Sequence, residues 1–72
     1  MTVPLDRLLE EMIAAQQKRL LDLGRRIEPG LTPEDLLQPH DHPKIAASAD
    51  FNFEDGVLAG YLAVRAALRA SR

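Results

Sequence analysis

The residues best suited to chemistry in this sequence are two histidines and an aspartate between two prolines. They are His40, Asp41 and His42, and the two histidines can point the same way if the segment is extended, because side chains two positions apart in a strand share a side. Neutral imidazoles and a carboxylate are normal ligands for zinc and other divalent metals. One hypothesis is therefore a small metal- or ligand-binding module at this turn, completed by Asp35, Asp50 or a second chain. The interpretation we favour is a plain polar turn, and we expect no cofactor.

A second candidate for chemistry is a stripe of arginines at helical spacing. Arg65, Arg69 and Arg72 share one helix face and are suited to contacting phosphates. The chain has nine Lys and Arg against eleven Asp and Glu, for a net charge of −2, whereas nucleic-acid binding usually shows a clear basic excess. A nucleic-acid-associated regulator is thus a further alternative, and we consider nucleic acid an unlikely partner.

A third pattern is a run of small residues near the C-terminus. Gly56 and Gly60 form a G-x-x-x-G pair, and the same face continues through Ala63, Ala67 and Ala70. A nucleotide-binding loop would need a preceding strand or a following Lys-Ser/Thr, and neither is present. The spacing instead favours close packing between helices. With no nucleophile or phosphate cradle near the histidines, we expect no enzyme activity.

Two long helices must position all of these residues. Apolar side chains recur at helical period from about residue 4 to 27, and Pro29 with Gly30 ends the pattern. The second helix is expected over about 53–70, with Asn52 as its cap. We expect Phe51 and Phe53 to anchor its start in the core. At the N-terminus, Thr2 is suited to cap the first helix, with Pro4 in its first turn.

The segment between the helices is expected to hold one or two short helical turns. Thr32-Pro33 has the pattern of a helix start and predicts a short helix over about Pro33 to Leu37. A second turn is expected over about Pro43 to Ala47. A long connector without structure would be unusual in a small domain.

Charge predicts how the long helices run. Both helices begin acidic and end basic, so an antiparallel pair brings opposite charges together and a parallel pair brings like charges together. Each surface pair contributes only about 0–1 kcal/mol, but the direction favours an antiparallel hairpin.

One polar residue interrupts the apolar stripe of the first helix. Gln16 lies at the centre of that stripe. Either it pairs with its counterpart across a two-fold axis and fixes the register of a dimer, or its amide reaches a backbone group or the edge of the interface. We prefer the second interpretation.

Length and composition limit the architecture. The chain has 72 residues, enough for one domain, and no cysteine, which excludes disulfides and thiolate metal sites. Its longest apolar run, from Gly56 to Val64, is shorter than the roughly 20 residues that span a bilayer. No secretory signal is visible, so we expect a cytoplasmic protein without a membrane partner.

These observations predict an all-α antiparallel hairpin that pairs with a second copy as a four-helix bundle. We expect a non-enzymatic module for protein–protein interaction or regulation. Its partner is expected to be itself, or another protein bound through an apolar groove. The predicted interface residues are Leu9, Met12, Gln16, Leu20, Leu23, Gly60, Ala63 and Ala67.

Overall fold

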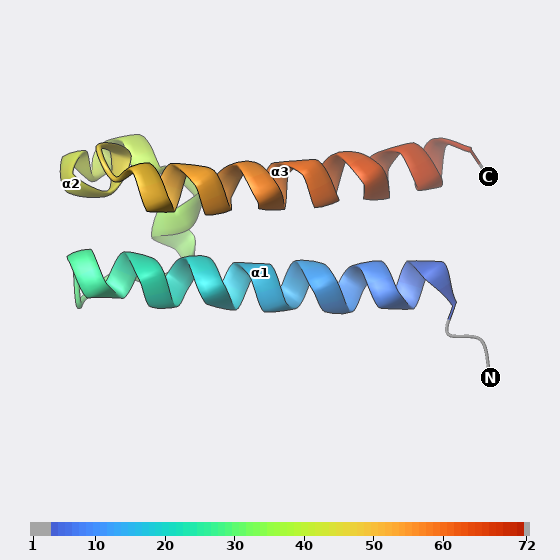
Figure 1. Cartoon of the computed structure of the whole chain (residues 1–72), viewed down its shortest axis with the longest axis horizontal. Helices are drawn as coiled ribbons and strands as arrows, with labels where there is room; N and C mark the ends of the chain where they lie inside the picture. Colours follow the sequence, from blue (N-terminus) through green and yellow to red (C-terminus); the bar gives the residue numbers. More distant parts are fainter. Residues whose placement is uncertain (1–3, 72) are drawn as a thin grey trace.

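The computed structural model, which describes residues 4–71, is an antiparallel helical hairpin. Its long arms are α1 (Leu5–Ile27) and α3 (Ala49–Ala70), which lie side by side, with the start of α1 and the end of α3 at the same end of the molecule (Figure 1). The connector contains two 3-10 helices, η1 (Pro33–Leu37) and η2 (Pro39–Asp41), and the short helix α2 (Pro43–Ala46). The described residues form no strand, so the predicted all-α hairpin is confirmed.

Helix α1 follows its predicted bounds closely. It starts after Pro4, whose carbonyl accepts the first helical hydrogen bond from the amide of Leu8 at 3.0 Å. It ends at Ile27, and the next residue, Glu28, adopts an extended conformation just before Pro29. The expected cap at Thr2 lies outside the described residues.

Helix α3 begins earlier than the sequence pattern suggested, and Asn52 is not its cap. Ser48 is the cap, and its hydroxyl accepts a hydrogen bond from the amide of Phe51 at 3.2 Å. Asn52 lies inside the helix, where its side-chain amide donates to the carbonyl of Ala46 at 2.9 Å. The prediction was wrong because both residues are good caps, and the earlier one lets Phe51 point into the core from within the helix.

The connector is ordered by its own short-range hydrogen bonds. Thr32 and Asp35 form a capping box at the start of η1, in which the Thr32 amide donates to the Asp35 carboxylate at 2.9 Å. The predicted short helix over Pro33–Leu37 is thus confirmed, with 3-10 rather than α geometry. The second turn also forms, as α2, and η2 precedes it. Arg25 of α1 holds the connector's start by donating from Nε to the carbonyl of Leu31 at 2.8 Å.

The core lies at the connector end of the hairpin. It consists of one side chain from α1, two from the connector and one from α3, which are Leu20, Leu31, Ile45 and Phe51. Gly24 of α1 is part of this packing, because a Cβ atom there would collide with the side chain of Leu31. Phe53, which was expected beside Phe51, is 70% exposed. The two rings cannot both face the core, because side chains two positions apart on a helix point about 200° apart.

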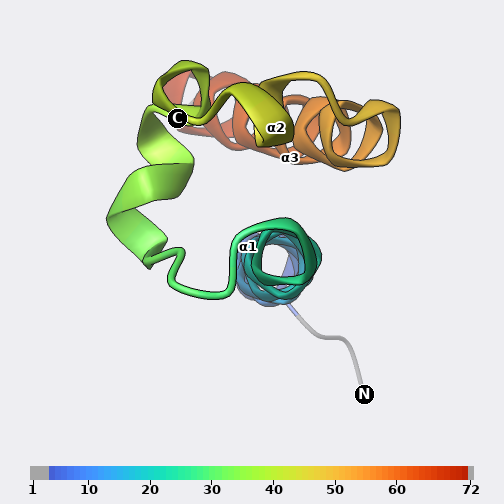
Figure 2. The same ribbon diagram turned by 90° about the vertical axis from the view of Figure 1, so that its left-hand side faces the viewer.

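The connector bridges the two long helices by way of one flank of α1. Seen along α1, it rises on that flank and then crosses through α2 to the start of α3 (Figure 2). The opposite flank, between α1 and α3, has no connector over it. None of the helices in the described part of the chain is long and apolar enough to cross a membrane.

Candidate interaction surface

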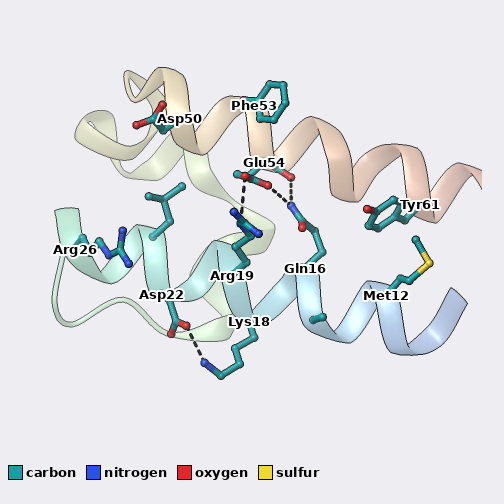
Figure 3. A pocket seen from close by; sticks show the side chains of 12 residues that line it. Met12, Gln16, Lys18, Arg19, Asp22, Arg26, Asp50, Phe53, Glu54 and Tyr61 are labelled. Atoms are coloured by element: carbon teal, nitrogen blue, oxygen red, sulfur yellow. Dashed lines mark hydrogen bonds and ion pairs between the residues drawn. The ribbon is translucent and has the colours of Figure 1, made fainter. Parts of the chain in front are cut away.

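A groove of about 670 Å³ runs between α1 and α3. Its lining is apolar toward one end, with Met12 and Tyr61 facing each other, and charged toward the other, with Arg26 and Asp50 (Figure 3). Leu23 and Phe53 line it as well. Tyr61 is half-buried in this lining.

Gln16 lies at the side of this groove and is fully occupied within its own chain. It is 7% exposed, and its Nε2 donates to the carbonyl of Glu54 at 2.8 Å and to the Glu54 carboxylate at 2.7 Å. Arg19 approaches the same carboxylate, with Nε 3.3 Å from Oε1 (Figure 3). The amide thus reaches a backbone group, as we preferred from sequence. It makes this contact across the hairpin, where it fixes the level of α1 against α3.

Large apolar side chains stay exposed along the groove side of both helices. Met12 lines the groove, and Leu8 stands one turn before it on the same stripe of α1. On α3, Val64 stands one turn from Gly60 and close to Tyr61 on the groove side. We call this surface the open face and define it by six residues, Leu8, Met12, Leu23, Phe53, Tyr61 and Val64. The sequence interpretation included Met12 and Leu23 but missed the other four, because a wheel shows which residues share a stripe but not which stripe the connector covers.

The predicted interface residues separate into two groups. Three are buried inside the single hairpin, namely Leu9, Gln16 and Leu20. The others are at least partly accessible, with Met12 and Leu23 in the groove and the small residues Gly60, Ala63 and Ala67 exposed on α3. A Cβ atom at Gly60 would meet no atom within 4 Å. The small-residue seam therefore does not form the contact between α1 and α3, and remains a prediction for contacts with another chain.

His42 connects three parts of the connector rather than pairing with His40. Its Nδ1 lies 2.6 Å from Oε2 of Glu28, and its Nε2 lies 3.6 Å from Oδ1 of Asp35. The hydrogen bond to Glu28 raises the pKa of His42 above its usual value. Asp41 belongs to a 3-10 turn and is exposed, so the extended segment required by the metal hypothesis is not formed. Among the described residues, no three His, Cys, Asp or Glu side chains are placed to hold a metal ion.

Two arginines of the predicted basic stripe are engaged in ion pairs across the hairpin. Arg65 Nη1 lies 3.1 and 3.2 Å from the two carboxylate oxygens of Glu10, and Arg69 Nη2 lies 3.7 Å from one of them. Arg72 lies outside the described residues. These contacts and the Arg19–Glu54 pair are the opposite-charge contacts that the antiparallel arrangement predicted.

The chain matches no protein family, and no curated protein or solved structure is significantly similar to it. The geometry of the open face is therefore the basis for its functional interpretation.

Proposed function

We propose that this chain is a non-enzymatic helical module that pairs with a second copy of itself. In the proposed dimer the open faces of two hairpins meet and form a four-helix bundle. Assembly of this kind suits a role in protein–protein interaction or regulation.

The observation that carries the proposal is the composition of the open face. Leu8, Met12, Val64 and Phe53 are between 39% and 70% exposed on one side of a 72-residue chain. A chain of this size buries only about 60% of the surface that its unfolded form exposes, so small domains often gain stability by association. A second hairpin would cover these side chains and add a second layer of helices.

The two alternative functions, a metal- or ligand-binding module and a nucleic-acid-associated regulator, gain no comparable support. The described residues hold no metal-binding cluster, and His42 is engaged by Glu28 and Asp35. Arg65 and Arg69 form ion pairs with Glu10, so they do not make a continuous basic surface. A different protein partner in the same groove is an outcome that the experiment below separates from self-pairing.

The test is solution mass by light scattering after size exclusion, over a range of concentrations. The wild type should give twice the 8.0 kDa of one chain. Met12→Glu and Val64→Glu should return the mass to one chain, because each places a charge in the apolar contact. A wild type that stays at one chain at every concentration overturns self-pairing and leaves the groove to a different partner.

Leu37→Glu is the matched control for these variants. Leu37 is 78% exposed but lies on η1, away from the groove. The Leu37→Glu variant loses the same kind of apolar side chain and gains the same charge as the two groove variants. Because the change lies outside the proposed contact, the solution mass of this variant should equal that of the wild type. Helix content by circular dichroism should be unchanged in all three variants, because each replaced side chain is already exposed within its own hairpin. If Leu37→Glu separates the chains as well, the open face is not the specific contact.

A further inference from the structure

The open face differs between its two ends. At the free end, where α1 starts and α3 ends, the exposed side chains of the open face are the apolar Leu8, Met12 and Val64. At the connector end the groove is lined by charged side chains of both signs, with Arg26 on α1 and Asp50 on α3, beside the apolar Leu23 and Phe53 (Figure 3). A second hairpin must therefore match an apolar end and an end that carries charges of both signs among apolar side chains.

Hydrogen bonds and ion pairs between α1 and α3 fix the level of each residue along the bundle. Glu54 is level with Gln16 and Arg19, and Arg65 is level with Glu10. Because the helices are antiparallel, Met12 is level with Tyr61, and Arg26 stands at the same end as Asp50, as Figure 3 shows.

Two hairpins can cover their open faces by two kinds of full overlap. With the two-fold axis parallel to the helices, α1 of one copy lies over α3 of the other at the same level. Met12 then meets the surface around Gly60 and Tyr61, and Arg26 meets Asp50. With the axis perpendicular to the helices, α1 lies over α1 in the reverse direction, and Arg26 meets Leu8.

The second arrangement removes charges from water without giving them partners, which is costly. The first pairs apolar with apolar and Arg26 with Asp50, and it does so twice by symmetry. We infer that the two copies pair with their free ends together, on a two-fold axis parallel to the helices. The inference rests on the proposed self-pairing and adds its orientation.

Gly60 is compatible with this arrangement. The space beside it is empty, since a Cβ atom there would meet nothing within 4 Å. In the parallel-axis dimer that space faces Met12 of the second copy, and a small residue lets the two helices approach closely.

Spin labels at the two ends distinguish the orientations. The chain has no cysteine, so Gly30→Cys labels the connector end and Ala70→Cys labels the free end. Both positions are exposed, and a Cβ atom at Gly30 meets no neighbour within 4 Å. Pulsed electron resonance then gives three distances between the labels of two copies. Dimers of one variant give the distance between the two labels at position 30 or between the two labels at position 70, and mixed dimers give the distance from position 30 of one copy to position 70 of the other.

The parallel-axis dimer predicts that both like distances are shorter than the mixed distance. The mixed pair is separated along the hairpin, whose long dimension is 41 Å. A mixed distance that is the shortest of the three would establish the perpendicular axis and overturn the inference. If the two labels at position 70 are close together but the two labels at position 30 are very far apart, only the free ends overlap, and this result also overturns the inference. In both cases the mass of two chains would preserve the proposed function, whereas a one-chain mass would end both proposals.

Charge reversal gives a second test of the same orientation. Arg26→Asp and Asp50→Arg should each raise the dimer dissociation constant about 5- to 30-fold, because two symmetric surface pairs are lost. The double variant should restore it. Lys44→Glu, on the exposed surface of α2, changes the net charge by the same amount as Arg26→Asp and should have no comparable effect. If the double variant does not recover the dissociation constant of the wild type, Arg26 of one copy does not meet Asp50 of the other, and the inferred orientation is wrong.

Discussion

Replacing Gln16 by leucine tests whether the polar residue in the apolar stripe stabilises the single hairpin. The variant loses one hydrogen bond to a carboxylate, worth about 1.5–3 kcal/mol, and one to a backbone carbonyl, worth about 1 kcal/mol. Two gains oppose this loss, because leucine buries more apolar surface and Glu54 keeps its contact with Arg19. We expect a net loss of about 1–2 kcal/mol, which lowers the Tm by about 4–16 °C in a chain of this size.

The assay is thermal unfolding followed by circular dichroism at one fixed protein concentration. Gln17→Leu is the matched control, since Gln17 is the exposed neighbour and its replacement should change stability by no more than about 0.5 kcal/mol. A double-mutant cycle with Glu54→Gln should give a coupling energy of about 0.5–3 kcal/mol. If Gln16→Leu is as stable as the wild type, or if the coupling to Glu54 is zero, the intrachain role is refuted.

Three further predictions concern the packing and the connector, and urea unfolding measures each. Gly24→Ala should destabilise by up to about 2 kcal/mol, because overpacking against Leu31 exceeds the gain in helix propensity; Gly56→Ala, in open space, should stabilise by about 1 kcal/mol. Ser48→Ala should cost about 1 kcal/mol through loss of the α3 cap. The raised pKa of His42 gives stability that is fully present below pH 6.5 and is lost as the pH rises through the folded-state pKa. Glu28→Gln should weaken that dependence, and an unchanged pH profile would contradict the His42–Glu28 contact.

Local signals predicted much of the secondary structure correctly. The apolar period of α1 and the Pro29-Gly30 pair gave its extent, because both act through residues close in sequence. The same holds for Thr32 and Pro33, the predicted cap and first residue of the short helix, which stand at the start of η1. The antiparallel direction also followed from the sequence, since charge polarity of each helix is a local property that limits how two helices pair.

Errors arose where one of two equivalent residues had to be chosen by tertiary contacts. Ser48 and Asn52 are both good caps, and Phe51 and Phe53 are both large aromatics. Phe51 is 1% exposed because it meets Leu20 from the first turns of α3, and this requires the helix to start at Ala49. That choice places Phe53 on the opposite side of the helix. No residue within this segment indicates which aromatic the core will accept.

The open face is likewise decided by a contact distant in sequence. Both flanks of α1 carry apolar residues, and the connector covers the flank near Gly24, where Leu31 lies against the helix without room for a Cβ atom. A glycine at this level permits that approach, and the flank with Leu8 and Met12 is left exposed. The connector thus stabilises one side of the hairpin and determines which side remains for a partner. Because the connector end also carries Arg26 and Asp50, charge complementarity at that end is the reason why a second copy is expected to align with the first rather than reverse.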